Sequence, residues 1–198
     1  MTTNRPTDAA PRLRVGLIGA GRAGVVIAAA LARAGHLTIA LSAVSDESRE
    51  RAAAVLPGIP VRDAGEVARG ADLVVVAVPD DDVAGLVRGL VVTEALHPGQ
   101  ILLHLHPGHG IGLLEAAVSR DVLPLAIHPA VALGGRASDV DRLVGTSFAV
   151  TTLRSLRPLG EALVLEMGGE PVWIEEEDRP AYAAALAAVR DSMSGVLT

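Results

Sequence analysis

A glycine-rich turn near the start of the chain constrains its fold more than any other feature. A short apolar run, Arg14–Ile18, leads directly into an Ala-rich stretch (residues 22–33) through the sextet Gly19-Ala20-Gly21-Arg22-Ala23-Gly24. Gly19 permits a tight turn, Gly21 leaves the backbone bare, and Gly24 allows a helix to pack closely on the preceding strand. The order of residues therefore predicts a buried strand, a tight turn and a helix that Gly35 ends.

A turn of this kind is suited to bind phosphate. The N-terminus of the predicted helix presents free N–H groups and the positive end of the helix dipole, and Arg22 adds a charge. In the strand–turn–helix context of residues 14–46, the pattern is typical of a dinucleotide-binding unit. We therefore expect residues 19–24 to contact the pyrophosphate of a dinucleotide. The alternative is a glycine-rich turn that binds no ligand.

The choice between NAD and NADP is expected to depend on the end of the second strand. An acidic residue about twenty positions beyond the glycines binds the ribose hydroxyls in dinucleotide-binding folds, and Ser45-Asp46 lies near that place. The carboxylate of Asp46 would repel a 2′-phosphate and favours NAD, whereas Ser45, Ser48 and Arg49 would hold that phosphate. Asp46 is explained equally well as a helix N-cap. The sequence thus predicts NADP or NAD as the cofactor and leaves both open.

Strand-like apolar stretches alternate with helical ones along the whole chain. The expected strands cover residues 14–18, 37–45, 59–61, 72–78, 100–105, 122–127, 147–151 and 171–174. The expected helices cover residues 22–33, 48–56, 64–69, 80–91, 111–120 and 156–167, with a last one from Arg179 onward, and residues 129–145 are expected to form a loop. This alternation predicts an α/β fold with a doubly wound, mostly parallel sheet.

Ligands of such sheets bind beyond the carboxyl ends of the strands. Val78 ends a central strand and Pro79 follows it, and we expect both to border a nicotinamide ring. The next strands end near four histidines, His104, His106, His109 and His128. Ketone reduction by hydride transfer needs a proton donor, and His104 and His128 are the candidates for this catalytic role.

Two other interpretations of these histidines stay open. A His-x-His segment with further histidines would suit zinc, but no carboxylate accompanies it at a suitable spacing, so we expect no metal. The imidazoles would also serve to hydrogen-bond the backbone of their own loops.

The composition excludes several classes of protein. The net charge is −6, basic residues form no block and aromatic residues are 2% of the chain, which argues against a nucleic-acid partner. The chain has no cysteine, so disulfides, cysteine-ligated zinc and cysteine nucleophiles are excluded, and a cytoplasmic location fits. Glycines and Arg22 interrupt the apolar stretch over residues 15–34, which leaves it too short to cross a membrane, for which about 20 residues are needed.

The chain is expected to comprise a disordered leader (residues 1–12), a dinucleotide-binding domain (13–176) and the start of a C-terminal helical domain (177–198). In the last segment an apolar helix stripe recurs at steps of four, three and four, through Tyr182, Leu186, Val189 and Met193. We expect this helix to dock on its own domain, to lead into a helical domain absent from this chain, or to pack on a second subunit and so form a homodimer.

Several motifs occur in the order that is typical of one family. They are the glycine turn, Val76-Ala77-Val78-Pro79-Asp80, the segment from His104 to Gly110, Ala126-Ile127-His128-Pro129, and Glu166-Met167-Gly168-Gly169-Glu170-Pro171. With them the chain, from Leu13 to its end, resembles the Rossmann-like proteins that carry an uncharacterised C-terminal helical domain. These are relatives of pyrroline-5-carboxylate reductase, 6-phosphogluconate dehydrogenase and ketopantoate reductase. The resemblance implies a nicotinamide-dependent reductase, in some members linked to ketopantoate.

The chain departs from the family's pattern at three places. His104-Leu105-His106-Pro107 replaces a His-x-Ser-Gly segment, Ala132-Leu133 replaces a Thr-Phe pair, and near the end Tyr182-Ala183 and Asp191 replace a Tyr-His pair and a later Asn. The first hypothesis is an NAD(P)-dependent oxidoreductase that acts on a small keto acid or imine. The departures and the missing helical domain motivate the second hypothesis, a non-catalytic dinucleotide-binding or regulatory module.

Overall fold

The structure is a computed structural model that describes the backbone of residues 12–195 and the side chains of residues 12–189. Apart from Arg12, the predicted leader lies outside the described residues, and so does the side chain of Met193 in the predicted apolar stripe. Within the described part of the chain, no helix is long and apolar enough to cross a membrane.

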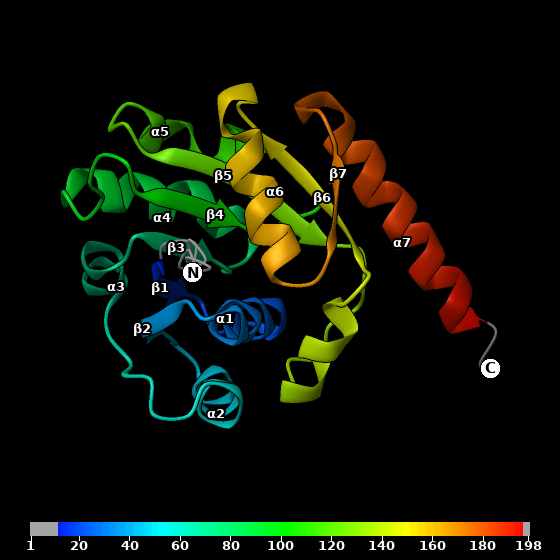
Figure 1. Cartoon of the computed structure of the whole chain (residues 1–198), viewed down its shortest axis with the longest axis horizontal. Coiled ribbons are helices and arrows are strands. Elements are labelled where there is room, and N and C mark those ends of the chain that lie inside the picture. The colour runs from blue at the N-terminus through cyan, green and yellow to red at the C-terminus, as the bar shows by residue number, and fades with distance from the viewer. Residues whose placement is uncertain (1–11, 196–198) are drawn as a thin grey trace, which may run out of the picture.

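A seven-stranded sheet forms the centre of the fold (Figure 1). Its strands are β1 (Arg14–Ile18), β2 (Leu37–Ser42), β3 (Leu73–Val76), β4 (Ile101–His104), β5 (Leu123–Pro129), β6 (Ser147–Thr152) and β7 (Glu170–Trp173). Their spatial order is β2-β1-β3-β4-β5-β6-β7, and neighbours run parallel except β5 and β6. The predicted doubly wound, mostly parallel α/β fold is confirmed.

Helices connect the strands and cover both faces of the sheet (Figure 1). The α-helices are α1 (Arg22–Ala34), α2 (Asp46–Val55), α3 (Ala64–Gly70), α4 (Asp80–Val92), α5 (Glu115–Val118), α6 (Arg157–Glu166) and α7 (Arg179–Gly195). Four 3-10 helices accompany them among the described residues: η1 (Ile111–Leu114), η2 (Ala137–Leu143), η3 (Arg154–Leu156) and η4 (Glu176–Asp178).

Strand β3 shows how the core divides into two halves. Leu73 and Val75 point to the face that α1, α2, α6 and η2 cover, and Val74 and Val76 point to the face that α3, α4 and α5 cover. Because side chains alternate along a strand, a strand buried on both faces must be apolar at every position. This requirement explains the uninterrupted run of Leu and Val that predicted a central strand.

Four local predictions need correction. The helix expected over residues 48–56 begins at Asp46, because the hydroxyl of Ser45 accepts a hydrogen bond from the N–H of Ser48 and caps the helix. The strand expected over residues 59–61 is a single bridge between Val61 and Leu41. The helix expected over residues 111–120 is a 3-10 turn followed by one α-helical turn, and the loop expected over residues 129–145 contains η2.

Gln100, just before β4, is fully buried and connects β4 to α3 on the face of the sheet that α3, α4 and α5 cover. Its amide nitrogen donates hydrogen bonds of 2.7 Å to the carbonyl oxygens of Ala68 and Ala71, which end α3. Each carbonyl also has a second partner, because the N–H of Ala71 donates to Ala68 and the ring of His97 contacts the carbonyl of Ala71. Loss of the Gln100 amide would remove one bond from each carbonyl and would also remove the Oε1 acceptor of the His97 N–H. Each lost hydrogen bond in a buried place costs free energy.

We therefore predict that Gln100→Met lowers the free energy of unfolding by roughly 1 to 3 kcal/mol. The matched control is Thr38→Val, because the buried Thr38 hydroxyl has no hydrogen-bond partner among the described residues. This change removes an unpaired group and should leave stability unchanged or raise it by up to about 1 kcal/mol. Urea denaturation of both variants measures the difference, and equal effects would contradict the assignment.

Candidate functional site

The glycine turn has the backbone geometry that its sequence predicts. Gly19 has a φ of +91°, and its N–H donates a 3.1 Å hydrogen bond to the carbonyl of Ser42 at the end of β2. A Cβ atom at this position would lie 2.6 Å from the carbonyl oxygen of Ala77. Only glycine combines this left-handed conformation with so close an approach of two backbones.

Gly24 and Gly21 have different surroundings. A Cβ on Gly24 would lie 2.6 Å from the Cβ of Ala77, so its absence lets α1 pack against the segment that follows β3. A Cβ on Gly21 would meet only the Ala77 carbonyl oxygen, at 3.2 Å, and the residue has an ordinary φ of −68° as the N-cap of α1. Because Gly21 is not required by the fold, its bare backbone is available for a ligand to approach.

A second loop lies against the glycine turn. A Cβ on Gly135 would lie 3.1 Å from the Cα of Arg22 and 2.7 Å from the side chain of Arg51. The guanidinium of Arg51 in turn donates a 2.9 Å hydrogen bond to the carbonyl of Ala20. The sequence predicted no role for Arg51 or Gly135, and the only signal for this contact is the pair Gly134-Gly135 in the loop expected over residues 129–145.

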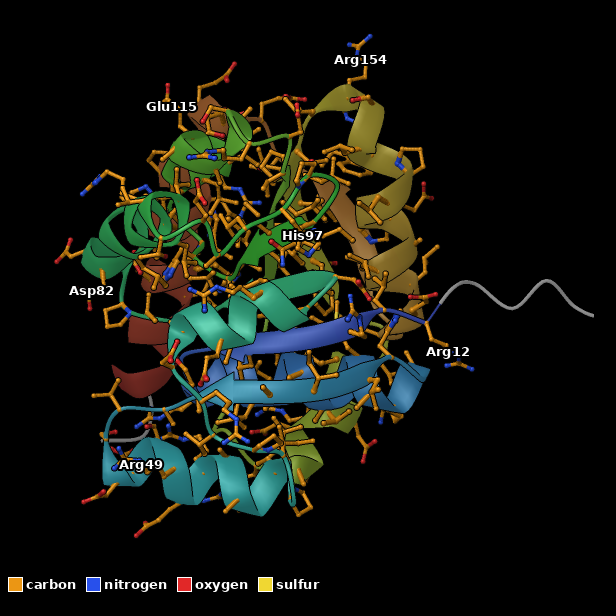
Figure 2. All side chains as sticks on the ribbon, turned by 90° about the vertical axis from the view of Figure 1, so that its left-hand side faces the viewer. Arg12, Arg49, Asp82, His97, Glu115 and Arg154 are labelled. Carbon is orange, nitrogen blue, oxygen red and sulfur yellow. The ribbon has the colours of Figure 1, made fainter. Side chains whose placement is uncertain are left out.

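The residues expected to contact the adenosine ribose lie beyond the end of β2. Ser45, and not Asp46, caps α2, which overturns the N-cap alternative for Asp46. The carboxylate of Asp46 is 93% exposed and accepts a 2.9 Å hydrogen bond from Arg49. Figure 2 shows Arg49 on the outer surface at α2. An acidic and a basic side chain are therefore both present at this end of the sheet.

Val78 and Pro79 continue from β3 at the same edge. A Cβ on Gly19 would lie 2.9 Å from a methyl group of Val78, which places Val78 directly beside the glycine turn. Pro79 is exposed and is the N-cap of α4. The first residue of that helix, Asp80, accepts a hydrogen bond from Nδ1 of His106, and His109 Nε2 lies 3.9 Å from its other oxygen.

His104, one of the two predicted catalytic residues, is fully buried at the end of β4. Its Nε2 donates a 2.7 Å hydrogen bond to the carbonyl of Gly110, and its Nδ1 accepts one of 3.2 Å from the N–H of His106. Burial lowers the pKa of His104 to about 3, so the ring is neutral. Both nitrogens are thus used within the loop that follows β4.

His128, the other predicted catalytic residue, is partly exposed near the end of β5. Its Nδ1 lies 2.9 Å from the hydroxyl of Tyr182 on α7, and the two rings meet edge to face. Burial first, and then the positive charge of Arg179, lower the pKa of His128 to about 4. Among the described residues, no group donates to or accepts from its Nε2.

The four histidines do not gather as metal ligands. Among the described residues, no group of three or more His, Asp or Glu side chains has an arrangement that could hold a metal ion. His104 and His106 stack at 5.6 Å between ring centroids, but His104 Nε2 is occupied by a backbone carbonyl and His106 Nδ1 by Asp80.

The fold and the glycine turn agree with a comparison against protein families. A family model described as a Rossmann-like domain matches residues 2–129, which is about two thirds of the chain. The chain belongs to the Rossmann-like domain family. No curated protein is significantly similar to it in sequence.

Solved structures share the fold of this Rossmann-like chain at low sequence identity. A Bacteroides fragilis protein assigned to the NADP oxidoreductases superposes with a TM-score of 0.77 and 18% identity over 93% of this chain and 69% of its own. An imine reductase variant from Myxococcus stipitatus in complex with NAD+ has a TM-score of 0.69 and 23% identity, over 94% and 62%. Pyrroline carboxylate reductase from Plasmodium falciparum with NADP bound has a TM-score of 0.61 and 16% identity, over 92% and 67%. The chain thus spans about two thirds of the length of these proteins.

The start of α7 is fixed to the Rossmann-like domain at the same edge. Glu176, in η4, accepts hydrogen bonds of 3.2 Å from the N–H groups of Gly110 and Gly112. Tyr182 contacts His128, as described above, and Figure 1 shows α7 extending away from the sheet beyond this region. The sequence placed Tyr182 in an apolar stripe and at the position of the family's Tyr-His pair, but the contact of its hydroxyl with His128 was not predicted.

Two histidines with lowered pKa values, His104 and His128, make stability depend on pH. Their folded-state pKa values, about 3 for His104 and about 4 for His128, lie below the ordinary value of 6.5. As pH falls below about 6.5 the unfolded chain takes up protons that the folded chain does not, so folding stability is complete above that pH and is lost below it.

We predict that the free energy of unfolding falls by roughly 1.4 kcal/mol per pH unit for each of these histidines between pH 6 and pH 4. Denaturant titrations across this range measure the slope. His104→Gln should reduce the slope, and His109→Gln, at an exposed side chain, should not. A slope that is the same in wild type and His104→Gln would contradict the prediction.

Proposed function

We propose that this chain is the dinucleotide-binding part of an NAD(P)-dependent oxidoreductase that acts on a small keto acid or imine. The observation that carries the proposal is the geometry of Gly19, Gly21 and Gly24. Two of these glycines are required by backbone contacts, and the third leaves the start of α1 open. Structural relatives that were solved with NAD+ or NADP support the same assignment.

The residues at the carboxyl edge would hold such a cofactor as follows. Residues 19–24 bind the pyrophosphate at the N-terminus of α1, where the first turn contains no acidic side chain to oppose it. Ser45 and Asp46 contact the adenosine ribose, and Val78 and Pro79 border the nicotinamide. The bound cofactor supplies the hydride for the reduction.

The preference for NADP or NAD depends on the Asp46–Arg49 pair. If the carboxylate of Asp46 turns to the ribose hydroxyls, it favours NAD. If Arg49 and Ser45 hold a 2′-phosphate, the same site favours NADP. The exposed ion pair leaves both side chains free to change partner, because such pairs contribute little energy.

The two histidines have different roles in the proposed reaction. His128 is partly exposed and its Nε2 is unoccupied by described groups, so it would give a proton to the carbonyl oxygen or imine nitrogen of the substrate. His104 is too deeply buried to touch a substrate, and we assign to it the support of the loop from His106 to Gly110.

Dinucleotide binding is tested with Gly21→Ala. The added methyl group would occupy the place where the pyrophosphate approaches. We therefore predict that the Kd for NADH or NADPH rises at least about tenfold, which corresponds to a loss of ~1.4 kcal/mol of binding free energy. As the loss of a glycine N-cap, the change should lower stability by at most about 1 kcal/mol. Isothermal titration calorimetry measures the affinity.

The control for this variant is Gly89→Ala, which adds a methyl group to open space on α4. It should bind either dinucleotide as wild type does. If wild-type protein binds neither NAD(H) nor NADP(H), the proposal is wrong.

Catalysis is tested separately from binding. We predict that the full-length protein oxidises NADPH or NADH in the presence of ketopantoate, other 2-keto acids or cyclic imines, and that His128→Ala reduces kcat at least about a hundredfold with an unchanged dinucleotide Kd. Absorbance at the nicotinamide band follows the reaction. Binding without turnover on any of these substrates would instead support the non-catalytic binding module.

A further inference from the structure

A cation is buried at the start of α7. The side chain of Arg179 is fully buried, and its Nε donates a 2.7 Å hydrogen bond to the hydroxyl of Thr151 on β6. Its Nη2 donates to the carbonyl oxygens of Ala126 on β5 and Ala149 on β6, at 2.8 and 3.2 Å. All three acceptors are uncharged, and Nη1 is buried with no hydrogen-bond partner among the described residues.

Arg179 forms no ion pair within the described part of the chain. The carboxylate of Glu176 contributes a favourable interaction, but this carboxylate accepts hydrogen bonds from Gly110 and Gly112. A buried guanidinium that lacks a bonded carboxylate is costly, and its net charge acts on neighbouring groups through a medium that screens weakly. Burial lowers the pKa of Arg179 to about 10, so the group is still positive at neutral pH.

The charge lies beside the proposed proton donor. Tyr182 follows Arg179 by three residues and so lies on the same side of α7. The Tyr182 hydroxyl contacts Nδ1 of His128, and His128 is the register partner of Ala149, whose carbonyl accepts from Arg179. The guanidinium and the His128–Tyr182 pair therefore form one cluster between β5, β6 and α7.

The sign of the charge has opposite consequences for the two partners. A positive group disfavours the imidazolium form of His128 and favours the phenolate form of Tyr182. At Tyr182 the charge of Arg179 opposes the larger effect of burial, which raises the pKa of the hydroxyl. The other charged or titratable groups that face this cluster are His104 and His106 from β4 and its loop, and Glu176 from η4. The buried His104 is neutral, and Arg179 is the charged group that acts on both members of the pair.

We propose that Arg179 is a positioning residue that makes Tyr182, rather than His128, the source of the proton in the reduction; this inference rests on the function proposed above. His128 Nε2 gives its proton to the carbonyl oxygen or imine nitrogen as the hydride of a reduced nicotinamide dinucleotide reaches the adjacent carbon. At the same time His128 Nδ1 takes the proton of the Tyr182 hydroxyl. The imidazole stays neutral and changes tautomer, the phenolate of Tyr182 is stabilised by Arg179, and solvent returns the proton afterwards.

The test measures protonation directly and needs neither cofactor nor substrate. Histidine labelled with 15N is titrated by NMR, and the His128 signals are assigned by their loss in His128→Gln. We expect the wild-type ring to stay neutral to pH 5. In Arg179→Gln, which keeps amide donors for the strand carbonyls and loses the charge, the pKa of His128 should rise by about 1 unit or more. In Arg179→Lys, which keeps the charge, it should stay low.

The chain offers a second readout, because Tyr182 is its only tyrosine. Ultraviolet titration of tyrosinate therefore reports on Tyr182 alone, and its pKa should be higher in Arg179→Gln than in wild type. Arg154→Gln is the matched control: it removes the same charge from the exposed Arg154 at the outer edge of the molecule (Figure 2), and it should move neither group.

Two results would overturn the proposal. One is a wild-type His128 that titrates near 6.5, which is decisive even if Arg179→Gln does not fold. The other is a folded Arg179→Gln protein in which the pKa values of His128 and Tyr182 both stay unchanged.

Once a substrate is known, Tyr182→Phe should lower kcat with little change in KM, and Arg179→Lys should restore the pH profile of the rate that Arg179→Gln alters. Failure of dinucleotide binding would refute the proposed function and leave these titrations unchanged.

Discussion

The close contact between the start of α1 and the end of β3 sets the geometry of this molecule. Gly24 meets Ala77 where any side chain would collide, and Gly19 turns the chain beside the same residue in a left-handed conformation. Because α1 begins directly after β1, its N-terminus lies at the carboxyl edge of the sheet, and the turn before it lies beside Val78. This contact sets the position proposed for a pyrophosphate. It also sets where the residues after β3 and the loop with Gly135 meet the glycine turn.

The antiparallel pair β5–β6 determines which residues lie at the carboxyl edge of the sheet beside His128. Since β6 runs against β5, Ala149 pairs with His128 and Thr151 pairs with Ala126. The chain then returns through β7, and α7 starts beside Ala126, at Arg179, and advances to His128, at Tyr182. A helix that follows the dinucleotide-binding strands in sequence is thereby placed next to the candidate proton donor.

Burial gives the ionisable groups of this edge unequal roles. His104 is buried, and both of its ring nitrogens form hydrogen bonds within its own loop. In His128, Nδ1 contacts the Tyr182 hydroxyl and Nε2 has no partner among the described groups. Arg179 adds a charge without a bonded carboxylate. A buried charge without a bonded carboxylate costs free energy, and ionisable groups with shifted pKa values are common where a fold positions groups for chemistry.

The sequence by itself determined the glycine turn, the alternation of strands and helices and the residues at the carboxyl edge. These features depend on local sterics and on the burial of a strand on both faces of the sheet. Both leave a pattern in residues that are adjacent in the sequence. It could not separate His104 from His128, because both follow apolar strands and only the surrounding loops decide which ring is enclosed. It also missed Arg179 and the hydroxyl of Tyr182, since their partners lie 28 to 54 residues away in the chain. Only the tertiary structure, through the antiparallel β5–β6 pair and the path of α7, brings these charges to one place.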